Sequence, residues 1–183
     1  MSKISIQLMP DRTVGGFLLL YDNTGTQVGN GLSVLGKAAV NDATANGNPL
    51  ADSKLPYGDT PTGTYNFLAI TDCVPPYNNT HSYGVNGVMK LDPASGDAAT
   101  AKANGRSGIL IHGGDLGAGG QLRRTNGCLR LRDDEFAYLK NNINGLYPID
   151  PITVIEVVEI GTPSAIACDI NSTCGDGDPP PGF

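Results

Sequence analysis

The stretch of sequence that decides how this chain folds and reacts is Ile111-His112-Gly113-Gly114, followed by Thr125-Asn126-Gly127-Cys128-Leu129-Arg130. Residues 108–111 are a glycine and three apolar residues, which predict a buried strand ending at His112. The glycine-rich segment after His112 allows the chain to fold back toward Cys128. Because a thiol attacks only as its thiolate, a base such as His112 nearby would make Cys128 a nucleophile.

The composition favours a mainly β protein. The 183 residues are 39% hydrophobic, enough to bury a full core, most simply as one domain over residues 1–163. The 25 glycines and 13 prolines indicate many turns, and only one segment predicts a convincing helix. The net charge of −6 argues against a nucleic-acid binder, and no apolar run is long enough to span a bilayer.

Alternation of apolar and polar residues predicts a series of strands separated by turn residues. We expect strands at residues 4–8, 16–22, 26–36, 64–71, 87–91, 108–111 and 151–160. Segments 37–59 and 92–106 lack steady periodicity, so we expect surface loops there. One short helix is expected after Cys128, from Asp133 to Asn142, with acids at its positive N-terminal end and Asn144-Gly145 as its stop.

Three motifs in this order resemble the L,D-transpeptidase catalytic domain, a family called YkuD-like. They are Gly58-Asp59-Thr60-Pro61-Thr62-Gly63-Thr64-Tyr65, then the His112-Gly113 segment, then the Thr125–Arg130 block. The resemblance spans roughly residues 60–139. Many members carry His where this chain has Asn126, so a hydrogen bond that the usual His would supply is in doubt.

The resemblance implies a β-sandwich-like domain that acts on bacterial peptidoglycan. In that family a cysteine attacks the carbonyl of the third, diamino-acid residue of a tetrapeptide stem, and D-alanine leaves. The thioester then passes to another amine, which gives a crosslink or a D-amino acid exchange, or to water, which is L,D-carboxypeptidase activity. Peptidoglycan stem peptides would be the partner, and we expect no cofactor.

The candidate residues fall into three groups. Taken alone, a cysteine is usually a small buried hydrophobe and a histidine is usually structural. Together in this block, Cys128 is expected to be the nucleophile and His112 the base. The backbone groups of Gly127, Cys128 and Gly113 are candidates for stabilising the oxyanion or orienting the imidazole. Substrate-binding candidates are Arg130, Thr125, Arg106 and Tyr83.

Positive charge is concentrated around the candidate nucleophile. Within residues 106–132 lie Arg106, Arg123, Arg124, Arg130 and Arg132. A basic site on an acidic body suggests an anionic substrate, although solvated loop arginines are an equally open interpretation.

Metal sites and disulfides find little support in the spacing of the residues. A zinc site from Cys73, His81, His112 and Cys128 matches no standard pattern, so we expect none, and we expect His81 to be simply exposed. The C-terminal tail, residues 164–183, is rich in Gly and Pro. Its Cys168 and Cys174 could form a disulfide or stay reduced, and residues 169–173 resemble a calcium loop without the closing Glu.

Three interpretations of the function remain open. The chain could be an enzyme of its own cell's wall, an antibacterial effector delivered by a specialised secretion system and countered by an immunity protein, or a non-catalytic peptidoglycan-binding module. Retention of His112 and Cys128 argues against the third. The N-terminus alternates like a strand and shows no signal-peptide pattern, which favours the effector. In each case we expect the site of action to be the bacterial periplasm or cell wall.

Overall fold

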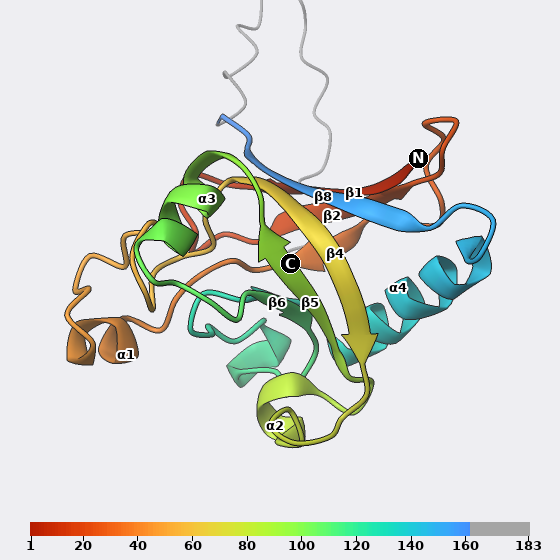
Figure 1. Cartoon of the computed structure of the whole chain (residues 1–183). Helices are drawn as coiled ribbons and strands as arrows, with labels where there is room; N and C mark the ends of the chain where they lie inside the picture. The colour runs from red at the N-terminus through yellow and green to blue at the C-terminus, as the bar shows by residue number, and fades with distance from the viewer. Residues whose placement is uncertain (162–183) are drawn as a thin grey trace, which may run out of the picture.

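The structure is a computed structural model, and it describes residues 1–161. Its centre is a sheet of eight strands in the spatial order β3-β2-β1-β8-β4-β5-β6-β7 (Figure 1). Neighbouring strands are antiparallel apart from the pairs β1–β8 and β6–β7, which are parallel. The strands are β1 (Ser2–Leu8), β2 (Gly16–Tyr21), β3 (Leu32–Val34), β4 (Gly63–Thr71), β5 (Val88–Pro93), β6 (Leu110–His112), β7 (Leu129–Arg130) and β8 (Ile152–Glu159).

Alternating burial explains how the strands build the core. In β1, the side chains of Ile4, Ile6 and Leu8 are at most 1% exposed, because alternate residues of a strand point to the same face. The C-terminal strand β8 adds Ile155 and Val157 to the same core. Although β8 comes last, it lies between β1 and β4, parallel to the first and antiparallel to the second. It therefore joins the two halves of the sheet.

The sheet curves until its two ends meet. Just after β3, Leu35 exchanges two backbone hydrogen bonds with Arg130 of β7: the N–H of Leu35 donates over 2.9 Å and that of Arg130 over 2.8 Å. A further bridge joins Ala38 to Thr125. The mainly β fold class is therefore confirmed, as a nearly closed sheet wrapped around its core.

The helix expected after Cys128 is α4 (Asp133–Leu146), which packs beside the sheet (Figure 1). Its buried residues Phe136, Leu139 and Ile143 recur at helical spacing. The helix runs past the expected stop at Asn144-Gly145, so that boundary was wrong. The reason is that Leu146, beyond the glycine, still packs against the core and extends the last turn.

Shorter helices lie in segments that we expected to be loops or that gave no helix signal. These are α1 (Val40–Ala45), α2 (Thr80–Tyr83), α3 (Gly96–Ala103) and the 3₁₀ turn Ala118–Gly120. The loop assignments of 37–59 and 92–106 were therefore wrong in part. In α3 the buried face consists of Ala98 and Ala101, and alanine gives little hydrophobic contrast from which to recognise an amphipathic pattern.

Within residues 1–161, no helix is both long and apolar enough to cross a membrane. The expectations for the tail, namely its extent over 164–183, the Cys168–Cys174 pairing and the calcium-like loop at 169–173, lie outside the described residues.

Candidate active site

His112 is the last residue of β6, and Cys128 comes directly before β7, the parallel neighbour of β6. His112 is paired with Arg130 in the ladder, and Cys128 lies two residues before Arg130 in the chain. Both side chains line one cavity of about 220 Å³. The structure therefore brings the expected base and the expected nucleophile together.

The imidazole of His112 is held in one orientation. Its Nδ1 lies 2.8 Å from the carbonyl oxygen of Gly113, and because a carbonyl can only accept, Nδ1 carries the hydrogen and Nε2 is left to take a proton. The ring of Tyr83 packs edge-on at 5.2 Å between centroids. His112 is only 2% exposed, and this burial lowers its pKa to about 4 despite the bond to Gly113. The ring is therefore neutral near pH 7.

The thiol of Cys128 is also uncharged at rest. Its Sγ lies 3.6 Å from the carbonyl of Gly108. Burial raises the pKa of Cys128, and a backbone bond from Leu110 together with the positive charges of Arg106 and Arg130 partly offsets that rise. The cavity is therefore lined by a neutral thiol and a neutral imidazole.

The turn before Cys128 determines which backbone group is available to an oxyanion. The N–H of Gly127 donates to Oγ1 of Thr125 over 3.0 Å, and that hydroxyl donates to the carbonyl of Cys128 over 2.9 Å. The hydroxyl of Thr125 and the N–H of Gly127 are thus used within the turn. Among residues 1–161, the N–H of Cys128 meets no hydrogen-bond acceptor. Of these two N–H groups, that of Cys128 is therefore the one that can still donate to a bound group.

Arg130 supports the walls of the cavity. Its guanidinium donates to the carbonyls of Ser82 at 2.6 Å, His81 at 3.3 Å and Asp115 at 2.6 Å. These bonds connect α2 to the glycine-rich segment that follows His112. The same side chain lines the cavity, so it also places positive charge in the cavity wall.

Arg106 lies beneath the turn rather than on an open surface. It is 4% exposed and donates to backbone carbonyls, among them those of Gly58 and Gly127. Arg132, by contrast, pairs with the exposed Asp134. The arginines of this region therefore divide between buried supports and solvated side chains. Arg123, Arg124 and Arg130 line the cavity that holds Cys128 and His112, and Arg106 lines a second cavity that Cys128 also borders.

Cys128 also lines a second cavity, of about 410 Å³. The two cavities share Tyr83, Asn126 and Cys128. The first has three arginines in its wall, whereas the second has one, Arg106, together with tyrosines that include Tyr57 and Tyr77. Cys128 therefore lies where two differently lined cavities meet.

His81 is a cavity residue that the sequence did not indicate. It lines the cavity of Cys128, and its Nδ1 lies 2.6 Å from a carboxylate oxygen of Asp115. The side chain is 79% exposed, as expected. No spacing rule places residue 81 beside residue 128, because Arg130 creates this neighbourhood through the carbonyls of His81 and Asp115.

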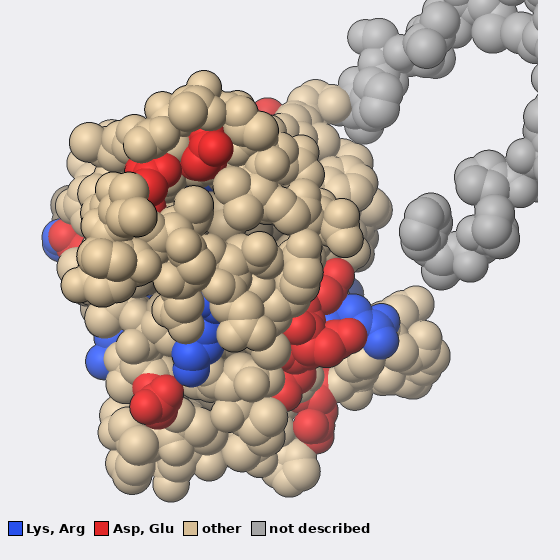
Figure 2. Space-filling view, turned by 90° about the vertical axis from the view of Figure 1, so that its right-hand side faces the viewer, with Lys and Arg blue, Asp and Glu red and all other residues tan. Residues whose placement is uncertain are grey.

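Charge over the rest of the molecule is mainly negative. The face in Figure 2 carries several groups of Asp and Glu and few Lys or Arg, in keeping with the net charge of −6. Over the described part of the chain, no three His, Cys, Asp or Glu side chains are grouped so that they could hold a metal ion. Neither Cys73 nor Cys128 is in a disulfide there.

Comparison with known protein families matches residues 15–166 to the YkuD model, the L,D-transpeptidase catalytic domain. The match covers most of the chain, so the chain belongs to this family, and the resemblance noted from the sequence motifs is confirmed. Family membership supports L,D-transpeptidase activity in general and a place of action at the cell wall. Comparison with curated proteins gives no match.

Proposed function

We propose that this protein is a cysteine-dependent L,D-transpeptidase or L,D-carboxypeptidase that acts on peptidoglycan tetrapeptide stems. The observation that carries the proposal is the shared cavity of Cys128 and His112, with Nδ1 of His112 held by the Gly113 carbonyl. A fixed imidazole beside a thiol is the arrangement that nucleophilic catalysis requires.

The first half-reaction makes a thioester. The thiol proton passes from Sγ of Cys128 to Nε2 of His112, and the sulfur attacks the carbonyl carbon of the third stem residue. The N–H of Cys128 stabilises the oxyanion of the tetrahedral intermediate. When the C–N bond breaks, the imidazolium returns its proton to the amine of D-alanine, and the acyl group remains on sulfur.

The second half-reaction decides the product. An amine from another stem or from a free D-amino acid attacks the thioester and forms an amide, while His112 removes the proton from the attacking amine and returns one to the departing sulfur. If water attacks the thioester instead of an amine, the product is the hydrolysed stem. The arginines in the wall of the first cavity suit the carboxylates of stem peptides or D-amino acids. Tyr83 borders both cavities, so its side chain suits contact with a stem peptide that passes from one cavity to the other.

Release of D-alanine from purified tetrapeptide stems tests the proposal. The wild-type protein should release D-alanine, and mass spectrometry of the acyl product should show a trimmed stem, an exchanged terminal residue or a crosslink. Cys128→Ala should abolish every product, while its thermal unfolding stays close to that of the wild type because only one sulfur is removed. Product formation by Cys128→Ala would overturn the assignment of the nucleophile.

One feature favours a second candidate, a peptidoglycan-binding module without activity. Asn126 lines both cavities at the position where many members of the family carry His. Binding of stems without release of D-alanine by the wild-type protein would support this alternative.

The place of action is tested separately. We propose that the protein acts in the periplasm or cell wall as an antibacterial effector delivered by a specialised secretion system, with an immunity protein as its partner. Expression with a periplasmic leader should then damage the wall of the host, whereas the Cys128→Ala variant and expression without the leader should not. Harmless periplasmic expression of the active protein would exclude the effector role.

A further inference from the structure

Arg106 is a buried positive charge that is held by backbone carbonyls. Its side chain makes no ion pair with any carboxylate among residues 1–161. Burying a cation costs free energy unless the protein supplies hydrogen-bond acceptors for it. The number of hydrogen bonds that Arg106 donates therefore indicates a specific role. Its Nη1 donates to Ser53 O (2.7 Å), Leu55 O (3.4 Å) and Asp59 O (2.7 Å), and its Nη2 to Gly58 O (2.9 Å) and Gly127 O (3.1 Å).

The carbonyl of Gly127 receives a second hydrogen bond. The hydroxyl of Thr60, which is fully buried, donates to it over 2.9 Å. A trans peptide is planar, so its C=O and N–H point in opposite directions. Two donors on the carbonyl of Gly127 therefore fix the direction of the N–H of Cys128, which is the oxyanion donor proposed above.

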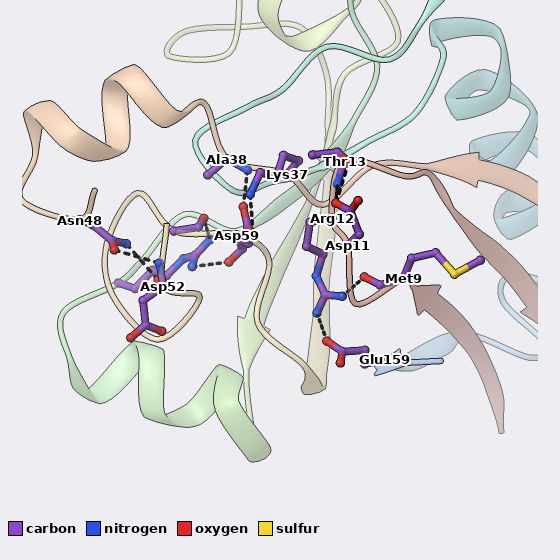
Figure 3. A network of polar contacts seen from close by, with 12 residues as sticks. Met9, Asp11, Arg12, Thr13, Lys37, Ala38, Asn48, Asp52, Asp59 and Glu159 are labelled. Atoms are coloured by element: carbon purple, nitrogen blue, oxygen red, sulfur yellow. Dashed lines mark hydrogen bonds and ion pairs between the residues drawn. The ribbon is translucent and has the colours of Figure 1, made fainter. Parts of the chain in front are cut away.

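The loop that carries Thr60 is itself anchored. The carboxylate of Asp59 accepts a bond from the N–H of Ala38 at 2.8 Å and pairs with Nζ of Lys37 at 3.0 Å (Figure 3). Lys37 in turn accepts a bond from the N–H of Thr125 at 3.1 Å through its carbonyl. The turn before Cys128 is thus supported at Thr125 and at Gly127 by one connected polar network.

Gly127 shows how closely this network approaches the turn. Its φ is +92°, a conformation that favours glycine, and a Cβ atom there would overlap the carbonyl of Gly58 and the guanidinium of Arg106. The turn therefore has no room for a side chain at residue 127.

We propose that Arg106 and Thr60 are positioning residues that hold the Gly127–Cys128 peptide so that its N–H faces the oxyanion during acyl transfer. This inference rests on the proposed function, since it concerns the same thiol. Arg106 has an additional effect that Thr60 lacks, because its positive charge favours the thiolate and holds the pKa of Cys128 below the value that burial alone would give.

Two small reagents separate positioning from thiol reactivity. p-Nitrophenyl acetate acylates a thiol through a tetrahedral oxyanion, whereas iodoacetamide alkylates it by direct displacement of iodide and forms no oxyanion. Each reaction is followed by the mass of the peptide that contains Cys128. Neither reagent requires a stem peptide, so the result is independent of whether tetrapeptides are the substrate.

The decisive variant is Thr60→Val, which removes one donor to Gly127 and keeps the shape of the side chain. It should slow acylation of Cys128 by about 10-fold or more, because oxyanion donors lose their effect when they are misdirected, and should leave alkylation unchanged. Thr62→Val is the matched control, since its hydroxyl lies 3.4 Å from Asp97 and makes no bond to Gly127. The control should keep both rates.

Arg106→Gln should slow both reactions, because it removes the directing bond and the positive charge. If Arg106→Gln does not fold, Thr60→Val alone decides the question. Equal slowing of both reactions in Thr60→Val, or no slowing of acylation, would overturn the positioning role. If the wild type releases no D-alanine from stems, but Thr60→Val still slows acylation and not alkylation, the proposed function is refuted and the positioning role stands.

Discussion

Burial of the His112 imidazole makes the stability of the protein depend on pH in a way that one substitution should remove. The pKa of His112 falls from 6.5 to about 4 on folding, because the ring is desolvated. As the pH falls below 6.5, the unfolded chain takes up a proton that the folded protein does not. The stability present above that pH is therefore lost as the pH falls toward 4.

The size of the effect follows from the difference between the two pKa values. Each pKa unit corresponds to about 1.4 kcal/mol, so the wild type should lose about 2 to 3 kcal/mol of unfolding free energy between pH 7.5 and pH 4.5 through this group. In His112→Gln this part of the pH dependence should be absent. Other titrating groups are common to both proteins, so they cancel in the difference.

Urea unfolding of the two proteins across this pH range, followed by circular dichroism, measures the difference directly. An NMR titration of the imidazole provides an independent check on the folded protein. Equal loss of stability in the wild type and in His112→Gln would refute the argument that a buried, neutral imidazole lies in this site.

Two further substitutions test the backbone and the core around the site. Gly127→Ala should destabilise the protein by at least about 2 kcal/mol in urea unfolding, since its positive φ and the close carbonyl of Gly58 both oppose a side chain there; unchanged stability would show that the turn can rearrange. Tyr65→Phe should cost about 1 kcal/mol, because the buried phenol donates to the carbonyl of Pro61 over 2.7 Å, and a neutral result would mean that this bond contributes no net stability.

Local patterns in the sequence predict most of the longer strands, because alternation marks them. The strand expected at 26–36 is limited to Leu32–Val34, and the two-residue strand Leu129–Arg130 was not expected because it is too short to carry a pattern. The run at 152–159 is rich in β-branched residues and becomes β8. Its position between β1 and β4 depends on pairings between distant parts of the chain, which no local pattern encodes. The strand order therefore could not be predicted from the residues, although most of the longer strands could.

The candidate nucleophile and base could be named from the sequence because they lie close together in it and come with a family motif. The roles of the residues around them could not be predicted in the same way. Arg106 and Arg130 were expected to bind substrate, yet their guanidinium groups are largely occupied by backbone carbonyls from distant segments. Whether an arginine faces solvent or a buried loop is decided by tertiary packing, and composition records only that it is charged.

The parallel pairing of β6 with β7 separates the site from the connection between the two strands. His112 is set by its pairing with Arg130, and Cys128 comes directly before the paired residues of β7. The chain between them makes an excursion that is closed by a hydrogen bond of 2.8 Å from the N–H of Gly117 to the carbonyl of Gln121. Residues inserted at the tip of this excursion would leave the reacting atoms where they are. The tip is thus a place where the length of the chain can vary while the strands that carry the candidate site stay as they are.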